Sequence, residues 1–456
     1  MTDPEGSLRV NNEGPHERKI LVVTILYDPM HPKYLDESDV QGEMTRVFDV
    51  CQSCRLCISY CSSFPTLFGL LDARHDRTAP LTNRQQNQVI DACFQCKLCV
   101  IACPYTSAKG DEKALDFPRL MLRADAMRHA TNQHGRRRLA ATKVLGNTDL
   151  LGRLGTTIAP LANATAFRPG SVARRFMETT VGVSSQRLVQ PFARQRFSTW
   201  FARRPRVRLA SRQGHVALFP TCLVEYQAPN IGKDLVKVYE RNGVECSLVD
   251  GASCCGAAFL HAGDLANFTK VASKNVKALA ASVRSGNDVV VPQPTCSYIL
   301  KNDYVDYVGG DDARLVADHT FDSSEYLMRL HKDDGASLDM VFPGDVPETV
   351  SYHTPCHLRA QNIGLKSRDL MKLTGTRVKL VQECSGVNGV WGLRADIADV
   401  SLKASKKLGD EITLAGGDVV AGDCHLANGV ITEQTGRIPV HPIQMVARAY
   451  GIPEEN

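Results

Sequence analysis

Eight of the sixteen cysteines in this 456-residue chain fall into two runs with the same spacing. The first run is Cys51-x2-Cys54-x2-Cys57-x3-Cys61, and the second is Cys93-x2-Cys96-x2-Cys99-x3-Cys103, with Pro104 directly after it. Thiolates spaced in this way bind 4Fe–4S clusters: three neighbouring cysteines hold one cluster, and the fourth reaches across to the other. Two complete copies therefore predict two such clusters and a protein that transfers single electrons.

The spacing also predicts which cysteines share a cluster. We assign one cluster to Cys51, Cys54, Cys57 and Cys103, and the other to Cys61, Cys93, Cys96 and Cys99. Structural zinc is the alternative, because CxxC pairs also bind zinc. Three evenly spaced cysteines followed by a fourth exceed what a tetrahedral zinc site needs, which favours iron–sulfur clusters. Ser62 stands where a proline often follows the fourth cysteine, but this removes no ligand.

Further cysteines mark an internal repeat in the second half of the chain. In the first copy three predicted strands are followed by Cys222, by Cys254 and Cys255, and by Cys296, and Gly256 completes a CCG motif. The corresponding cysteines of the second copy are Cys356, Cys384 and Cys424, with Ser385 in place of the second cysteine of the pair. Ligands bind open α/β sheets outside the carboxyl ends of the strands, so we expect each set to converge there.

The four thiols of the first copy favour a cluster or metal site, because adjacent cysteines can bridge neighbouring irons. The alternatives are cysteines packed in a core and a redox-active thiol pair, in which Cys254 and Cys255 would be catalytic. The three cysteines of the second copy could bind a metal ion such as zinc with His357 or His425, since imidazole is a good ligand for zinc and iron. The alternative is that this copy binds nothing. Cys246 lies in a strand without a matching partner, and we expect it to be packed.

Alternating strand and helix patterns position these cysteines. Strands are predicted at 215–220, 244–249, 289–291, 350–353, 378–381 and 419–421, and helices at 231–242, 265–284, 365–373, 395–414 and 443–450. This order predicts two repeated Rossmann-like α/β cysteine-rich domains, 215–345 and 346–456, with parallel sheets. The 31-residue gap Ser62–Ala92 and a predicted helix at 117–130 indicate a mainly α-helical two-cluster module at 40–130. The apolar segment Ile20–Tyr27 is typical of a short strand or a docking segment.

The segment between these parts, 131–214, is predicted to be a basic amphipathic linker. Residues 135–215 contain fifteen Arg and one Lys against Asp149 and Glu178, a net charge of +14 in a chain whose net charge is +5. Arginine interleaved with Leu, Phe and Trp is typical of segments that lie on anionic lipid, so we expect docking on a membrane surface or a partner. A solvated charged face is the alternative, and nucleic-acid binding is disfavoured.

Other features limit the class of protein. The sequence has no run of about 18 apolar residues that would predict a membrane-spanning helix. Residues 1–18 are polar and show no secretory signal. Unpaired thiols then predict a reducing cytoplasm, with the protein peripheral on the inner face of the cell membrane. GxGxxG after a strand, GxxxxGK(S/T) and HExxH are all absent, so we expect a partner to supply the electrons.

Two ferredoxin-type runs followed by two cysteine-rich repeats resemble the heterodisulfide reductase-like family of CCG cysteine-rich domain proteins. This family includes the iron–sulfur subunits of anaerobic glycerol-3-phosphate dehydrogenase and of glycolate and lactate oxidases. The segments Thr354-Pro355-Cys356-His357, Cys384-Ser385-Gly386 and His441-Pro442-Ile443 fit its cysteine-rich domains. The resemblance implies an electron-transfer subunit that relays electrons from a flavoprotein dehydrogenase towards quinone at the membrane.

The resemblance also implies a third cofactor, a non-cubane 4Fe–4S cluster ligated by Cys222, Cys254, Cys255 and Cys296. Ile299, Ser385 and Ala427 stand where the family pattern has cysteine, which disfavours two full clusters of this kind. Two other functions stay open: a heterodisulfide or thiol–disulfide reductase acting at the CCG site, and a zinc-stabilised scaffold without redox activity.

Overall fold

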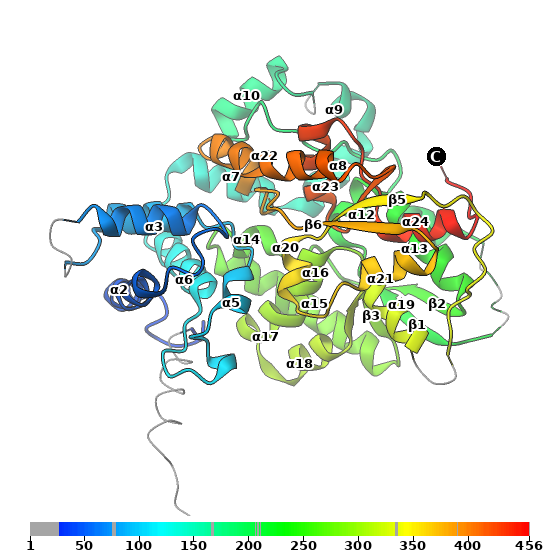
Figure 1. Cartoon of the computed structure of the whole chain (residues 1–456), viewed down its shortest axis with the longest axis horizontal. Helices are drawn as coiled ribbons and strands as arrows, with labels where there is room; N and C mark the ends of the chain where they lie inside the picture. The colour runs from blue at the N-terminus through cyan, green and yellow to red at the C-terminus, as the bar shows by residue number, and fades with distance from the viewer. Residues whose placement is uncertain are drawn as a thin grey trace, which may run out of the picture.

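The computed structural model describes residues 27–74, 79–165, 168–205, 207, 209, 211–332, 336–389 and 391–455. Figure 1 shows helices α2 to α6 gathered at one end of an elongated molecule, with the two sheets and their helices filling the rest. Residues 1–18 and nearly all of the segment Ile20–Tyr27, on which two expectations rest, lie outside the described residues.

The N-terminal part is mainly helical, as predicted. Its elements are α2 (Glu37–Cys54), α3 (Ser63–Asp72), α4 (Asn83–Asp91), α5 (Leu98–Ala102), the 3-10 turn η1 (Ser107–Lys109) and α6 (Phe117–Ala130). Helices α3 and α4 occupy the gap between the two cysteine runs, and α6 has the predicted bounds. The rings of Phe64 and Phe117, 4.6 Å apart between centroids, join α3 to α6 in a core that also includes Phe48 of α2. This core supports the helices and loops that carry the eight cysteines.

The first α/β unit is built on a parallel sheet in the order β2-β1-β3-β4. Its strands are β1 (Gly214–Leu218), β2 (Val244–Leu248), β3 (Asp288–Val291) and β4 (Thr320–Asp322). Its helices are α12 (Thr221–Tyr226), α13 (Pro229–Arg241), α14 (Ala257–Leu260), α15 (Leu265–Arg284), α16 (Pro294–Tyr298), the π-helical turn η2 (Ile299–Asp303), α17 (Tyr304–Tyr307), α18 (Gly310–Asp318) and α19 (Ser323–Lys332).

Both faces of this sheet are covered, as is usual for parallel sheets. Val289 and Val291 of β3 belong to the core shared with α15, whereas Val290 between them belongs to the core shared with α13. The strand order changes direction between β1 and β3. Their carboxyl ends therefore form the crevice in which doubly wound sheets bind ligands.

The second unit repeats this plan with a smaller parallel sheet in the order β6-β5-β7. Its elements are β5 (Thr349–His353), α20 (Cys356–Ala360), α21 (Lys366–Leu373), β6 (Arg377–Val381), the 3-10 turn η3 (Trp391–Leu393), α22 (Ala398–Ala415), β7 (Val419–Gly422), α23 (His425–Thr435) and α24 (Pro442–Ala449). All six strands predicted from the sequence are confirmed with small shifts at their ends, and β4 is the additional strand.

The basic segment is folded against both units rather than extended between them. It forms α7 (Arg136–Gly146), α8 (Thr148–Thr157), α9 (Ala159–Thr165), α10 (Val172–Val181) and α11 (Phe197–Arg203). Several of its arginines are buried in ion pairs: Arg138 with Asp125 at 2.6 Å, and Arg187 with Glu433 at 3.1 Å. Part of the +14 charge is thus neutralised internally. No helix in the described part of the chain is long and apolar enough to cross a membrane.

Candidate functional site

The four cysteines of the first repeat meet at the carboxyl edge of its sheet, as the repeat predicts. Cys222 lies in α12 after β1, Cys254 and Cys255 follow β2, and Cys296 lies in α16 after β3. The Cys255 thiol donates to the Cys296 sulfur at 3.3 Å. Hydrogen bonds link the thiols of Cys222, Cys254 and Cys255 in turn. Three loops that are distant in the sequence therefore supply one thiol cluster.

Two residues with positive φ shape these loops. Thr221 has φ 62°, which is a rare conformation for a β-branched residue and costs of order 1–3 kcal/mol, a cost the surrounding structure must offset. It directs the chain into α12 immediately before Cys222. Gly256, the glycine of the CCG motif, has φ 84°, and a Cβ there would come within 3.0 Å of the Phe268 ring. The motif therefore requires glycine at this position.

Cys254 is the thiol of this group that is most readily ionised. Hydrogen bonds from the Cys222 and Cys255 thiols and the Gly256 N–H lower its pKa well below the usual value. Hydrogen bonding to Cys254 and burial together raise the pKa of both Cys222 and Cys255. Donors aimed at one sulfur suit a ligand thiolate, because such hydrogen bonds tune iron–sulfur clusters.

Helix α8 of the basic segment contributes one residue that sequence reasoning missed. The Asp149 carboxylate accepts the backbone N–H of Cys254 at 2.9 Å and the Tyr226 hydroxyl at 3.2 Å. The available signal was that Asp149 is one of only two acidic residues in the basic segment. This segment therefore helps to position the first-repeat site.

The second repeat brings together two of its three cysteines. The thiols of Cys356 and Cys384 interact, and the Gly386 N–H donates to the Cys384 sulfur at 3.3 Å. Both contacts lower the pKa of Cys384. Gly386 has φ 62°, so it repeats the left-handed glycine of the CCG motif. Cys424 instead lies within electrostatic range of Cys296 in the first repeat, and burial raises its pKa to about 11.

The two histidines proposed as ligands differ in availability. Both ring nitrogens of His357 have partners: Nδ1 lies 3.0 Å from the Thr295 hydroxyl, and Nε2 lies 3.0 Å from the Gln95 carbonyl oxygen. Nε2 of His425 is buried without a hydrogen-bond partner. Among the residues that the structure describes, no three His, Cys, Asp or Glu side chains are grouped to hold a single metal ion. The predicted site at Cys356, Cys384 and Cys424 thus stays a prediction.

The eight cysteines of the N-terminal part lie in two groups of neighbouring thiols, and their assignment to two clusters stays a prediction. Burial raises the pKa of Cys51 to about 12, and the nearby thiols of Cys103, Cys57 and Cys54 add to this shift. Burial likewise raises the pKa of Cys61 and Cys99, each of which has Cys93 and Cys96 as neighbours. Four thiols per group are the donor set that a 4Fe–4S cluster needs. Such thiols bind iron as thiolates, so cluster binding releases their protons.

The group containing Cys96 lies against the second repeat. The Cys96 thiol lies within electrostatic range of Cys384, and Cys356 is influenced by Cys96 in the same way. The rings of Phe94 and Trp391 meet edge-on beside them, with centroids 4.7 Å apart. The N-terminal part also packs directly on the first repeat: the Tyr34 and Tyr307 hydroxyls lie 3.1 Å apart, and Arg119 pairs with Asp306. All three parts are therefore in contact with one another, and Cys424 of the second repeat lies within electrostatic range of Cys296.

One buried cation accompanies this contact. Lys97 is only 5% exposed, and its ammonium group donates to the Gln95 side chain at 3.0 Å. Its charge lowers the pKa of Cys93 and Cys96, whose pKa values burial raises to about 11 and about 12. A cation held here favours negative charge on the neighbouring sulfurs.

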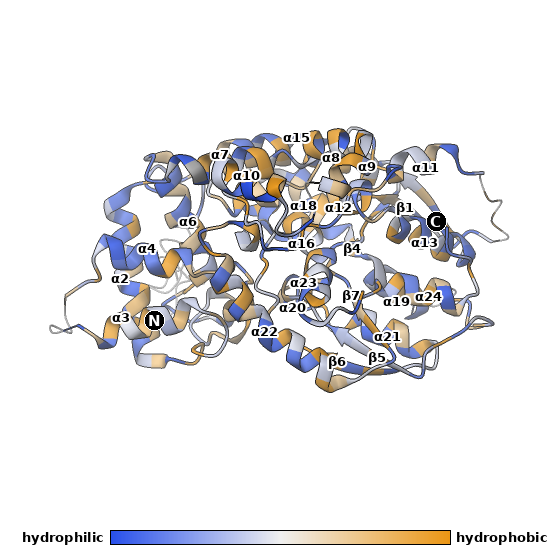
Figure 2. Ribbon diagram, turned by 90° about the horizontal axis from the view of Figure 1, so that it is seen from above, coloured by the Kyte–Doolittle hydropathy of each residue, from blue (hydrophilic) through white to orange (hydrophobic). Residues whose placement is uncertain are grey.

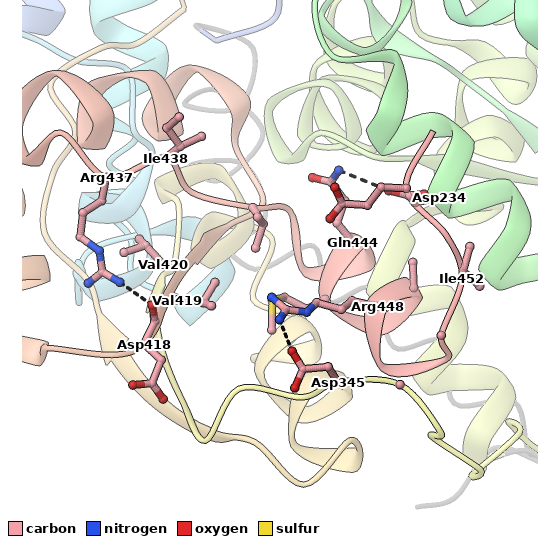
Figure 3. Close-up of a pocket in the computed structure, with 16 residues that line it drawn as sticks. Asp234, Asp345, Asp418, Val419, Val420, Arg437, Ile438, Gln444, Arg448 and Ile452 are labelled. Atoms are coloured by element: carbon pink, nitrogen blue, oxygen red, sulfur yellow. Dashed lines mark hydrogen bonds and ion pairs between the residues drawn. The ribbon is translucent and has the colours of Figure 1, made fainter. Parts of the chain in front are cut away.

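The pocket drawn in Figure 3 is unrelated to these thiols. It has a volume of about 540 Å³ and lies at the amino end of β7, the opposite end from Cys424. Both arginines that line it already have partners within the pocket: Arg448 pairs with Asp345, and Arg437 donates to the backbone carbonyl of Asp418 at 2.8 Å.

Comparison with known proteins agrees with this arrangement. Residues 216–301 and 350–427 match the CCG cysteine-rich domain, and residues 50–107 match a 4Fe-4S dicluster domain. The chain belongs to the family of iron–sulfur proteins with CCG cysteine-rich domains. These matches confirm the predicted family and fold class. The chain is an iron–sulfur protein of the electron-transfer type.

Three relatives illustrate the range of the CCG family. One subunit of the anaerobic glycerol-3-phosphate dehydrogenase of Escherichia coli (strain K12) is 28% identical over 310 residues, 67% of this chain and 76% of the relative. Lactate utilization protein A of Bacillus pumilus is 30% identical over 193 residues, 39% of this chain and 75% of the relative. One subunit of the CoM/CoB fumarate reductase of Methanothermobacter marburgensis is 26% identical over 247 residues, 52% of this chain and 46% of the relative.

Proposed function

We propose that this chain is an iron–sulfur subunit that passes electrons from a partner flavoprotein dehydrogenase, of the glycerol-3-phosphate or 2-hydroxy acid type, towards membrane quinone. The observation that carries the proposal is the approach of thiols from different parts of the chain, with Cys96 within electrostatic range of Cys384 and Cys424 within that of Cys296. The two N-terminal groups would hold 4Fe–4S clusters, and the first repeat would hold a non-cubane cluster. This chain's residues hold, bury and hydrogen-bond the cofactors, and the clusters supply the one-electron chemistry.

The donor end of this path is supported by exposed apolar side chains around the first cysteine group. Leu56, Ile58 and Tyr60 lie between Cys54 and Cys61 of the first run, and Ile101 lies between Cys99 and Cys103 of the second; all four are exposed. Exposed apolar clusters of this kind mark protein interaction sites. We therefore infer that the flavoprotein docks over the group formed by Cys51, Cys54, Cys57 and Cys103.

The acceptor end is supported by the position of α8. One part of this helix contacts the Cys254 loop through Asp149, while Leu150 and Leu154 of the same helix are exposed. If α8 rests on the inner face of the cell membrane, the first-repeat thiols lie just beneath the membrane face. This position supports quinone as the acceptor.

The test is an anaerobic reconstitution of the purified protein with its flavoprotein and a short-chain naphthoquinone. The substrate-reduced flavoprotein should bleach the absorption near roughly 400 nm that thiolate-ligated clusters give, and quinone should restore it. Ile58→Asp should weaken flavoprotein binding at least about tenfold, because it places a charge in an apolar interface. Ile438→Asp, at an exposed apolar position in the second repeat, is the matched control. Absence of bleaching by the flavoprotein would refute the proposal.

A second candidate function, thiol–disulfide reduction at Cys254 and Cys255, is favoured by the low pKa of Cys254 and the 3.3 Å contact between Cys255 and Cys296. Two electrons and two protons would convert a substrate disulfide into two thiols, with the electrons supplied by the N-terminal clusters. A mixed-disulfide adduct on Cys254, trapped by alkylation and located by mass spectrometry, would support it. If no adduct forms while quinone is still reduced, this function is excluded.

A further inference from the structure

Four arginines of the basic segment surround one surface hollow of about 630 Å³. They are Arg153 on α8, Arg194 and Arg196 in the loop before α11, and Arg203 on α11, and the remaining lining residues are Thr156, Thr157, Gln195 and Thr199. No carboxylate is among these lining residues. The nearest acidic influence falls on Arg153, which interacts with Tyr226, Asp149 and Glu225.

The hollow differs from the rest of the basic segment because three of its arginines have no carboxylate partner. Arg138, Arg187 and Arg204 are neutralised by Asp125, Glu433 and Glu240. Within the described residues, by contrast, Arg194, Arg196 and Arg203 enter no salt bridge. Three threonines, Thr156, Thr157 and Thr199, line the hollow as well. Unpaired cations and polar side chains around one hollow indicate a site for an anion with several oxygen acceptors.

An apolar stripe lies beside the hollow, along helices α8 and α9. Leu150, Leu154, Ile158 and Leu161 follow one another at helical spacing along α8 and α9, and each is more than half exposed. On α10, Val172 and Phe176 are exposed in the same way. Figures 1 and 2 both show α8, α9 and α10 along one edge of the molecule, and hydrophobic residues colour α8 and α9 in Figure 2.

The opposite face of α8 explains why this stripe points outward. A Cβ on Gly152 would come within 2.2 Å of the Tyr226 ring, and one on Gly155 would come within 2.0 Å of the Phe192 ring. These two glycines therefore let α8 pack directly on aromatic rings. That packing fixes the rotation of the helix, with Leu154 exposed and Arg153 at the hollow.

We propose that this hollow binds the phosphate of an anionic phospholipid while the adjacent apolar stripe inserts at the boundary of the acyl chains. The inference rests on the membrane contact in the proposed function and deepens it by naming the lipid class and the residues. A soluble phosphate compound would account for the arginines alone. It leaves no role for six large apolar side chains exposed beside them, whereas a lipid satisfies both features.

The experiment is flotation of the reconstituted protein with vesicles of phosphatidylcholine alone or with one-third phosphatidylglycerol, at about 0.1 M salt. Each basic side chain at an anionic surface contributes roughly fivefold to binding. R194Q/R196Q/R203Q should therefore weaken binding to the anionic vesicles about 100-fold. R314Q, at an exposed arginine on α18 of the first repeat, is the single-charge control and should weaken it fivefold or less. Leu154→Ser should lower binding to the anionic vesicles.

Three results would overturn the inference: flotation of the triple arginine variant equal to that of the parent protein, equal binding to neutral and anionic vesicles, or binding of inorganic phosphate to the hollow of a protein that does not float. Iron content and the circular dichroism melt confirm that each variant is folded. Quinone reduction in detergent tests the proposed function separately: if it persists while flotation fails, only the lipid site is refuted. If it fails while anionic flotation persists, the lipid site stands and the quinone function falls.

Discussion

Replacing the buried Lys97 with methionine should lower the reduction potential of the second cluster, which is the one assigned to Cys61, Cys93, Cys96 and Cys99. Methionine preserves most of the side-chain volume and removes the positive charge that faces Cys93 and Cys96. The reduced form of a cluster carries one more negative charge than the oxidised form, so a nearby cation stabilises it. Loss of that cation therefore makes reduction harder.

The magnitude follows from Coulomb's law. For two unit charges about 7 Å apart and an effective dielectric constant of about 20, Coulomb's law gives roughly 2 kcal/mol. For one-electron transfer this equals about 100 mV, since 59 mV corresponds to a factor of ten. Asp303 reduces the effect: burial raises its pKa to about 6, and Lys97 opposes this rise. Without Lys97 the carboxyl group takes up a proton and restores part of the charge, so we expect a shift of about 50–100 mV.

The assay is an anaerobic redox titration monitored by electron paramagnetic resonance, with Cys54→Ser used to assign the signal of the other cluster. The first cluster serves as an internal reference, because Lys97 is not among the charges acting on Cys51 or Cys57. Lys109→Met is the matched control: this exposed lysine acts on Cys103, so it should shift only the first cluster, by about 20 mV or less. An unchanged second potential, or equal shifts of both clusters, would refute the reasoning.

Three further variants test other parts of the arrangement. Cys255→Ser should remove the iron bound by the first repeat, because it breaks the contact with Cys296. The control Cys246→Ser, at a buried cysteine in β2, should keep that iron, and the iron content of the purified variants measures the difference. Phe94→Ala should lower the free energy of unfolding by about 3–5 kcal/mol in urea titrations, because it leaves a cavity against Trp391. Burial lowers the pKa of His441 to about 3, so the unfolded chain binds a proton first as pH falls, and stability is lost from about pH 6.5 downwards. Between pH 7 and pH 5 this loss is about 2 kcal/mol, and His441→Asn, which keeps an N-cap on α24, should remove that part of it.

Each of these variants has an outcome that contradicts the structure. Full iron content in Cys255→Ser would show that the first repeat holds no iron through this thiol. A loss below about 1 kcal/mol for Phe94→Ala would show that the N-terminal part and the second repeat do not pack through this ring. A His441→Asn variant with the same pH dependence as the parent protein would assign the acid sensitivity to other buried groups.

The sequence predicts the elements that carry the cysteines better than it predicts how those elements meet. Apolar runs in alternation with helical patterns locate six strands, because each of these strands is visible in its own local sequence. The additional strand, β4, has only three residues and no such pattern. The burial of Arg187 is not predictable, since its partner Glu433 lies 246 positions away. The role of Asp149 is hidden for the same reason: local sequence places it in a basic helix, and only the tertiary fold brings it to Cys254.

The position of the second repeat changes how its missing cysteine is interpreted. The second repeat contacts both other parts of the chain, with Cys384 within electrostatic range of Cys96 on one side and Cys424 within that of Cys296 on the other. In the proposed electron path its thiols therefore lie near both the N-terminal clusters and the first repeat, whether or not they bind iron. The contacts of His357 with Thr295 and with Gln95 hold all three parts at this junction. In the proposed path Cys356 and Cys384, beside Cys96, then supply two polarisable thiols at this junction.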